Sequence, residues 1–149
     1  MLKRDLVLVV DDDHETLHLL RLALERASFR VLTAASWEDV FDRVQLTYAD
    51  NTPIDVIVLD LMIPGRSGFD IYRALQRQLV SMPPVIMLTA VTGIQQRVDA
   101  RDLGVTKYLT KPTTPSKLIE TIREVLRESR RRKPKSEPIN RFPPKRFDR

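Results

Sequence analysis

The stretch Leu6-Val7-Leu8-Val9-Val10-Asp11-Asp12-Asp13 sets five apolar residues directly before three acidic ones. A short apolar run that contains β-branched residues is typical of a strand buried on both faces of a parallel sheet. In open α/β sheets, ligands bind outside the carboxyl ends of such strands. This stretch therefore predicts a strand that delivers acidic side chains to a binding edge.

Three further apolar runs end on polar residues in the same way. Val56-Ile57-Val58-Leu59 is followed by Asp60, and Val85-Ile86-Met87-Leu88 is followed by Thr89. A shorter run ends at Thr110-Lys111-Pro112. If these runs are parallel strands of one sheet, then carboxylates, a hydroxyl and an ammonium group converge at one edge. That edge is the predicted functional site.

The apolar runs alternate along the chain with segments of helical periodicity. The runs span residues 6–10, 29–34, 55–59, 84–88 and 106–110. Signals for helix ends lie between them: Asp13 as an N-cap, capping boxes at Ser36–Asp39 and Thr92–Gln95, Gly104 as a C-terminal stop, and Thr114-Pro115 as a helix start. Strand–helix alternation predicts an α/β fold of the (βα)5 type, a doubly wound parallel five-stranded sheet with helices on both faces.

Composition divides the 149 residues into a domain and a tail. Residues 129–149 hold nine of the 25 Lys and Arg residues and two of the 20 Asp and Glu residues, which leaves 16 basic and 18 acidic residues in 1–128. We therefore expect a mildly acidic globular domain over 1–128. The basic, proline-rich segment 129–149 is expected to be a disordered tail or a linker to a further domain. A role for it as an electrostatic arm for nucleic acid or an acidic partner stays open.

Two absences narrow the class of protein. The chain has no cysteine, which excludes a disulfide framework and a thiolate metal site. Its longest apolar runs are far shorter than the roughly 20 residues needed to span a bilayer. The apolar stretch after Lys3 and Arg4 is too short for a signal peptide and ends in three acids. The expected location is the cytoplasm.

The predicted site has the composition of a centre for a hard divalent cation. Two like charges about 4 Å apart repel by roughly 4 kcal/mol at an effective dielectric constant of 20, so Asp11, Asp12 and Asp60 together need a cation. A ligand set made only of oxygen favours Mg²⁺ or Mn²⁺. Asp60 is then placed as a carboxylate nucleophile that forms an acyl phosphate, and Lys111 offsets charge on the transferred group.

The chain resembles the receiver domain of bacterial two-component response regulators over roughly residues 4–128. The matching pieces are Val9-Val10-Asp11-Asp12-Asp13, the stretch from Asp55 to Gly65 with Gly68, Leu88-Thr89-Ala90, Gly104, and Tyr108-Leu109-Thr110-Lys111-Pro112. The resemblance implies a flavodoxin-like strand order 2-1-3-4-5. It also implies a switch that is phosphorylated by a histidine kinase or a phosphotransfer protein and then binds a downstream protein partner. The chain would be a single-domain regulator or the N-terminal part of a larger one, and a phosphorylation-linked homodimer stays open.

The resemblance also assigns roles to single residues. Asp60 would be the phosphoacceptor. Asp12, Asp60 and the backbone carbonyl of Met62 would bind the metal, with Asp11 acting mostly through water. Thr89 and Lys111 would hold the phosphoryl group, Thr89 and Tyr108 would together form the switch, and the peptide bond before Pro112 would be cis. The responding surface would consist of the fourth helix, the fifth strand and the fifth helix.

Two apolar residues lie at positions that tune the phosphoryl lifetime in relatives. They are Met62, two residues after Asp60, and Val91, two residues after Thr89. Neither side chain can hydrogen-bond an attacking water. We therefore expect slow self-dephosphorylation.

One motif offers an alternative function. His14-Glu15-Thr16-Leu17-His18 is a literal HExxH, the zinc-protease signature, on a predicted helix. Two histidines at i and i+4 could bind Zn²⁺ with Glu15 as the base. However, they are the only histidines in the chain, so a third ligand would have to be an acid elsewhere. Solvated side chains on the first helix are the favoured interpretation.

Overall fold

The computed structural model describes residues 3–132, which form five strands and five helices in strict alternation. In chain order these are β1 (Leu6–Val10), α1 (His14–Arg26), β2 (Arg30–Ala34), α2 (Trp37–Ala49), β3 (Val56–Leu59), α3 (Gly68–Gln78), β4 (Val85–Thr89), α4 (Ile94–Leu103), β5 (Lys107–Thr110) and α5 (Pro115–Arg132). The predicted (βα)5 alternation is confirmed.

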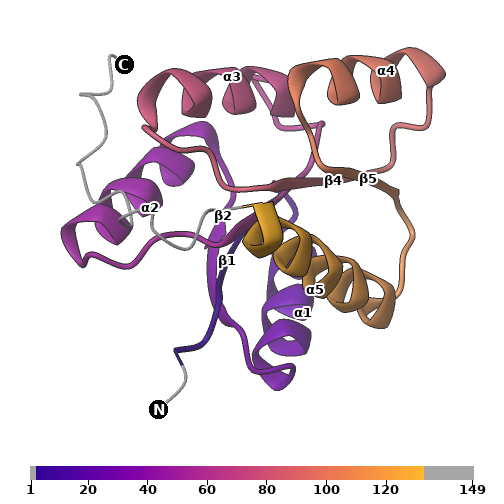
Figure 1. Ribbon diagram of the computed structural model, residues 1–149. Helices are drawn as coiled ribbons and strands as arrows, with labels where there is room; N and C mark the ends of the chain where they lie inside the picture. Colours follow the sequence, from indigo (N-terminus) through magenta and orange to yellow (C-terminus); the bar gives the residue numbers. More distant parts are fainter. Residues whose placement is uncertain (1–2, 133–149) are drawn as a thin grey trace.

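The strands form one parallel sheet in the order β2-β1-β3-β4-β5, as expected. Helices α1 and α5 cover one face, and α2, α3 and α4 lie on the other (Figure 1). Side chains of each central strand alternate between the two faces, because successive residues of a strand point in opposite directions. In β1, Leu8 and Val10 pack in the core under α2 and α3, whereas Val7 and Val9 pack in the core under α1 and α5. Burial on both faces explains why the strands read as continuous apolar runs.

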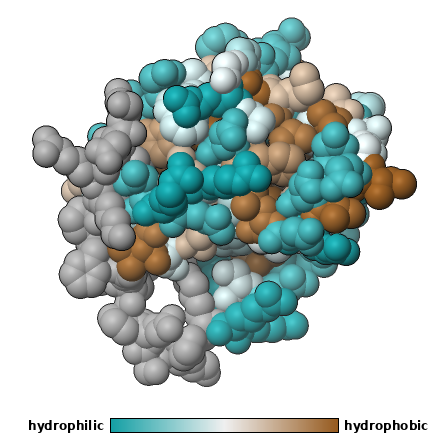
Figure 2. All heavy atoms as spheres, turned by 90° about the horizontal axis from the view of Figure 1, so that it is seen from above, coloured by the Kyte–Doolittle hydropathy of each residue, from teal (hydrophilic) through white to brown (hydrophobic). Residues whose placement is uncertain are grey.

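The outer surface is mixed. Figure 2 looks onto the side of α3 and α4 and shows hydrophilic side chains over much of this face, with hydrophobic ones between them. Among the described residues, Ile94 at the start of α4 is the most exposed large apolar side chain, at 81%. No helix within residues 3–132 is both long enough and apolar enough to cross a bilayer.

Most of the predicted helix ends are present. The Asp13 side chain accepts a hydrogen bond from the Glu15 N–H at the start of α1, and the Thr114 hydroxyl accepts one from the Lys117 N–H in α5. Gly104 ends α4 in the left-handed conformation, with φ +113°.

Two capping predictions need correction. Ser36 caps α2 through the Asp39 N–H, but the Asp39 carboxylate bonds to the N–H of Ala35 and not to that of Ser36, so the box is incomplete. The box predicted at Thr92 is wrong. There Gly93 is the N-cap, and no side chain caps α4.

Helix α5 runs to Arg132, four residues past the domain boundary placed at Glu128. Two features favour the extension: cationic residues in the last turn complement the helix dipole, and Arg130 forms an ion pair with Asp5 before β1. The expectation of disorder for the remainder, 133–149, lies outside the described residues.

Candidate functional site

Strand register brings Asp11 and Asp60 side by side. Val10 of β1 pairs with Leu59 of β3, so the acidic residues that follow them lie next to each other at the carboxyl edge of the sheet. The Asp60 N–H donates to the Val10 carbonyl at 3.0 Å and continues the ladder past the end of β3. Asp11 and Asp60 are buried, and Asp12 is exposed. Carboxylate oxygens of all three lie within 4.8 Å of one another.

Lys111 reaches into this cluster from the end of β5. Its Nζ lies 2.5 Å from Oδ2 of Asp11 and 2.9 Å from Oδ2 of Asp60. The Lys111 N–H donates to the Thr89 carbonyl at 2.8 Å, which fixes the residue beside β4. The Lys111–Pro112 peptide bond is cis. One ammonium group therefore bridges two buried carboxylates that come from different strands.

Burial and charge oppose each other at this cluster. Burial raises the pKa of Asp11 above its ordinary value, although hydrogen bonds from Lys111 and the Asp13 N–H act to lower it. Burial acts to lower the pKa of Lys111, but its hydrogen bonds to Asp11 and Asp60 and the charge of these two carboxylates together outweigh burial, so the pKa is raised. The ammonium form of Lys111 is thus held firmly beside the acids. A group with developing negative charge would meet a fixed cation here.

Backbone contacts fix the orientation of the carboxylates. Oδ1 of Asp11 accepts from the Asp13 N–H at 2.9 Å, and Oδ1 of Asp60 accepts from the Met62 N–H at 3.0 Å. Gly68 at the start of α3 lies so close behind that a Cβ atom there would come 2.4 Å from the Asp60 carbonyl oxygen. The missing side chain of Gly68 lets α3 approach the backbone of Asp60.

Thr89 and Tyr108 are joined through the loop after β4. Thr89 is fully buried, and its hydroxyl accepts a hydrogen bond from the Val91 N–H at 3.3 Å. The Tyr108 hydroxyl donates to the Val91 carbonyl at 2.6 Å. Both polar groups of one peptide segment are therefore held by the two residues that sequence reasoning linked in a switch. Val91, singled out there only for its side chain, connects them through its backbone.

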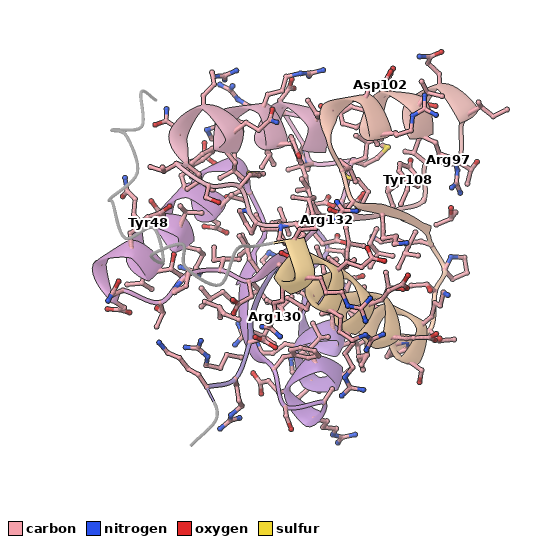
Figure 3. All side chains as sticks on the ribbon, in the orientation of Figure 1. Tyr48, Arg97, Asp102, Tyr108, Arg130 and Arg132 are labelled. Carbon is pink, nitrogen blue, oxygen red and sulfur yellow. The ribbon has the colours of Figure 1, made fainter. Side chains whose placement is uncertain are left out.

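Arg97 is a component of this region that sequence reasoning missed. Its guanidinium lies 4.8 Å from the centre of the Tyr108 ring and donates to the Thr110 hydroxyl at 2.7 Å. Figure 3 shows Arg97 beside Tyr108, between α4 and β5. Burial raises the pKa of Tyr108, and Arg97 acts against that increase. An exposed arginine on a polar helix gives no signal in the sequence, because only the packing of α4 on β5 brings it to the ring.

The oxygen cluster fits a hard divalent cation. Within residues 3–132, Asp11, Asp12 and Asp60 form the one group of three or more His, Asp or Glu side chains whose ligand atoms lie this close. Carboxylates alone, without nitrogen or sulfur ligands, are the donors that Mg²⁺ and Mn²⁺ prefer. The exposed Asp12 leaves one side of the cluster open to solvent, which suits an ion that keeps part of its water shell.

The HExxH motif forms no comparable site. His14, Glu15 and His18 are all exposed on α1. In the part of the chain that the structure describes, no acidic residue completes a three-ligand cluster with the two histidines. The structure gives the zinc-protease alternative no support.

Comparisons with known proteins point in one direction. The family model described as "Response regulator receiver domain" matches residues 7–123. The alkaline phosphatase synthesis transcriptional regulatory protein PhoP of Bacillus subtilis is 34% identical over 134 residues, which cover 90% of this chain and 53% of that protein. The transcriptional regulatory protein CpxR of Escherichia coli K12 is 37% identical over 123 residues, covering 83% of this chain and 50% of that protein.

A solved structure agrees with the sequence comparisons. The CheY-like response regulator receiver domain protein from Methanospirillum hungatei JF-1 superposes with a TM-score of 0.76 at 25% identity, over 87% of this chain and 98% of that one. The chain thus spans nearly the whole of a receiver domain structure, but about half the length of the curated relatives that it matches. On its fold, its sequence and the residues at the carboxyl edge of its sheet, the chain belongs to the response regulator receiver domain family.

Proposed function

We propose that Asp60 accepts a phosphoryl group from a histidine kinase or a phosphotransfer protein, in a reaction that depends on Mg²⁺ or Mn²⁺. The observation that carries the proposal is the contact of Lys111 Nζ with both Asp60 and Asp11 inside a cluster of three carboxylates. A structural ion pair needs one acid, and a third acid beside it adds repulsion. The surplus of negative charge is explained if a divalent ion binds at this edge, and that ion together with Lys111 would offset the charge of an incoming phosphoryl group.

In the proposed reaction, one carboxylate oxygen of Asp60 attacks the phosphorus atom of the donor. The bond from phosphorus to the donor's leaving group breaks, the leaving group keeps the electron pair, and a mixed anhydride forms on Asp60. Positioning and charge carry most of the catalysis in phosphoryl transfer. Lys111 would contact an equatorial oxygen of the transferred group, and the Thr89 hydroxyl would reach another.

The cation would be held by Asp12, Asp60 and the Met62 carbonyl, with Asp11 acting through water. When bound, it would supply positive charge next to the phosphoryl oxygens. Of this ligand set, the structure supports the three carboxylates through their mutual proximity. The Met62 carbonyl rests on the family resemblance alone. Lys111 already neutralises part of the cluster, so the folded domain does not need the ion in order to hold Asp11 and Asp60 together.

Phosphoryl incorporation tests the function. We expect the 149-residue chain to gain one phosphoryl group on incubation with acetyl phosphate and Mg²⁺, and to lose it on treatment with hydroxylamine, which cleaves acyl phosphates. Intact-mass measurement follows both steps. Because Met62 and Val91 cannot hydrogen-bond an attacking water, the added mass should decay slowly once the donor is removed. Absence of incorporation would refute the function, and a half-life of seconds would contradict the proposed slow dephosphorylation.

We further propose that phosphorylation is passed to the surface of α4, β5 and α5 through Val91. Thr89 holds the N–H of Val91, and Tyr108 holds its carbonyl, so a Thr89 hydroxyl that turns toward a phosphoryl oxygen releases one end of this segment. Shifting a two-state equilibrium from 1:99 to 99:1 needs about 5.5 kcal/mol. Hydrogen bonds to charged groups contribute roughly 1.5–3 kcal/mol each, so two new contacts from Thr89 and Lys111 are of the right size.

The Thr89→Ala variant tests this coupling. It should still accept a phosphoryl group on Asp60, because Lys111 and the acids remain. The NMR shift changes that phosphorylation causes in residues 94–110 should fall by at least half, since the link from Thr89 to Val91 is gone. Thr106→Ala, an exposed threonine just before β5, is the matched control and should respond like wild type. A full response in phosphorylated Thr89→Ala would show that the coupling runs elsewhere.

The output of the switch would be contact with a partner. We propose that the surface of α4, β5 and α5 binds a downstream protein or a second copy of this chain after phosphorylation. PhoP and CpxR are named as transcriptional regulators. Control of transcription through a further domain or a separate protein is therefore the favoured output. A cytoplasmic location stays a prediction that cell fractionation would check.

A further inference from the structure

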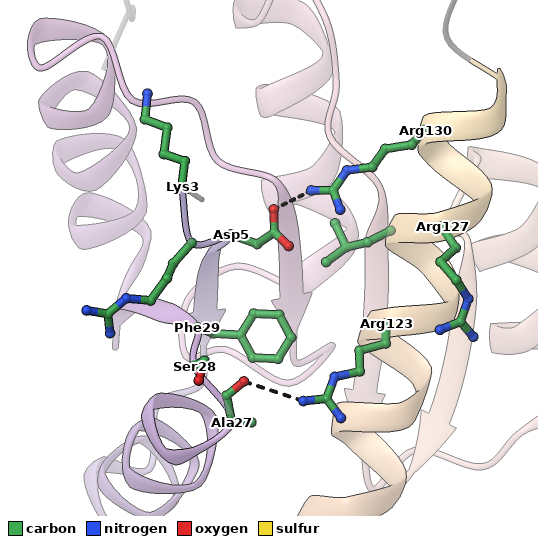
Figure 4. A pocket seen from close by; sticks show the side chains of 10 residues that line it. Lys3, Asp5, Ala27, Ser28, Phe29, Arg123, Arg127 and Arg130 are labelled. Atoms are coloured by element: carbon green, nitrogen blue, oxygen red, sulfur yellow. Dashed lines mark hydrogen bonds and ion pairs between the residues drawn. The ribbon is translucent and has the colours of Figure 1, made fainter. Parts of the chain in front are cut away.

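A cationic pocket lies at the edge of the sheet opposite the acid cluster. It has a volume of about 270 Å³ and is open to solvent. Its walls come from the segment before β1, the turn between α1 and β2, and the C-terminal half of α5 (Figure 4). The described residues that line it are Lys3, Arg4, Asp5, Ala27, Ser28, Phe29, Arg123, Leu126, Arg127 and Arg130. We call this the amino-edge pocket, because two of its walls lie directly before the first residues of β1 and β2.

Charge in the amino-edge pocket is strongly unbalanced. Five lining residues are Lys or Arg, and Asp5 is the one acid among the described lining residues. Arg130 pairs with Asp5, and Arg123 donates to the Ala27 carbonyl at 3.4 Å. Among the residues that the structure describes, Asp5 pairs with no other cation of the pocket. Most of the positive charge is therefore left for a ligand.

The helix dipole does not account for this cluster. The dipole favours cations in the last turn of α5, but Arg123 and Arg127 precede that turn, and Lys3 and Arg4 belong to the segment before β1. Placing them beside the α5 arginines adds repulsion between like charges. Lys3, Arg4 and Arg127 are all exposed, and for none of their side chains does the described part of the chain provide an ion-pair partner.

The spacing of the arginines indicates an extended polyanion. Arg123, Arg127 and Arg130 lie on successive turns of one face of α5, and seven residues of helix rise about 10.5 Å. Along one strand of B-DNA, charges repeat roughly every 3.4 Å of helix axis, so this length matches about three phosphates. Figure 4 shows Lys3 on one side of the pocket and Arg127 on α5 at the other, with side chains that do not point toward each other. Such an arrangement follows a backbone better than it encloses a small anion.

The lining also argues against recognition of bases. Phe29 is only 5% exposed, so its ring offers no free face for stacking, and Leu126 is buried as well. Hydrogen-bond acceptors on side chains are limited to Asp5 and Ser28 among the described lining residues. Guanidinium groups pair with phosphate oxygens in a bidentate manner. The sequence that follows α5 continues the charge, because six of the residues 133–149 are Lys or Arg and two are acidic.

We propose that the amino-edge pocket and the α5 arginines bind the phosphate backbone of double-stranded DNA without sequence preference. The pocket lies away from the acid cluster, since the acids follow the carboxyl ends of the strands and the pocket precedes their amino ends. DNA bound there leaves the phosphorylation site free. The interaction is electrostatic, is weakened by salt and positions the protein on DNA.

Fluorescence anisotropy with a labelled random-sequence 20-bp duplex tests the proposal on the 149-residue chain. Arg127→Glu is expected to weaken binding on the order of tenfold at 50 mM salt and to lower the slope of log K against log salt by about one. Lys3→Glu, in the segment before β1 that forms the wall facing α5, should also weaken binding. Arg101→Glu makes the same change of charge on α4, where its side chain is 75% exposed, and should lie close to wild type.

Three outcomes would overturn the proposal. The first is an equal loss of affinity in Arg127→Glu and Arg101→Glu, which would assign the binding to net charge or to residues 133–149. The second is an absence of salt-dependent binding in wild type. The third is poly-glutamate that competes as well as DNA at equal charge, which would identify an acidic protein as the partner.

Discussion

In the Asp60→Asn variant, phosphoryl incorporation from acetyl phosphate is expected to fall at least hundredfold, to the background of the mass measurement. Asparagine has nearly the shape of aspartate, and its side-chain oxygen can still accept from the Met62 N–H, but the amide is no nucleophile. Lys111 keeps its contact with Asp11. The acid cluster therefore loses the attacking group and little of its geometry.

The control for Asp60→Asn is Asp102→Asn, which makes the same chemical change at a carboxylate on the surface of α4 with a side chain 65% exposed. It should incorporate one phosphoryl group at the rate of wild type. Circular dichroism should show the same helix content in both variants. Incorporation by Asp60→Asn at the wild-type rate would place the phosphoacceptor at another residue, with Asp11 and Asp12 the first to examine.

The carboxyl edge of the sheet could be predicted because its determinants are local in sequence. Each buried strand is a continuous apolar run, and the polar residue that ends the run marks the edge. Once the strands are parallel and β1 pairs with β3, Val10 and Leu59 become neighbours and the acids after them must meet. The family resemblance added the strand order and the individual roles. Neither required knowledge of side-chain packing.

Features that depend on packing between distant elements were not predictable in this way. Arg97 meets Tyr108 only because α4 packs on β5, and the need for glycine at position 68 follows from the approach of α3 to the Asp60 carbonyl. The ion pair that joins the end of α5 to the segment before β1 is formed by Arg130 and Asp5, which are 125 residues apart in sequence. The capping box predicted at Thr92 failed because α4 begins after Gly93, and a sequence pattern locates a helix start only to within a few residues.

Lys111→Met is the second substitution with a large expected effect. Methionine keeps most of the length of the side chain and removes the ammonium group, so Asp11 and Asp60 lose their shared cation inside the protein. Leaving buried charges without a partner costs several kcal/mol. Because this site is partly open to solvent, we expect Lys111→Met to lower the free energy of unfolding by about 2 kcal/mol at neutral pH. Phosphoryl transfer should slow by roughly 10²–10³-fold, as when one preorganised donor is removed from an active site.

The effect of pH and Mg²⁺ on the stability difference between wild type and Lys111→Met distinguishes loss of the Lys111 charge from a packing defect. Because the pKa of Lys111 is raised in the fold, its charge stabilises the protein below its ordinary value of 10.5, and that advantage over Lys111→Met is lost as pH rises through the folded pKa. On the acidic side, the raised pKa of Asp11 means that its charged form costs stability above the folded pKa. Protonation of Asp11 should therefore reduce the difference in free energy of unfolding between Lys111→Met and wild type.

Mg²⁺ at neutral pH should also reduce this difference in free energy of unfolding, because a divalent ion restores positive charge beside the acids. Urea unfolding at several pH values, with and without Mg²⁺, measures all three effects. A stability difference that stays the same at every pH, with and without Mg²⁺, would mean that Lys111 acts through packing and not through charge.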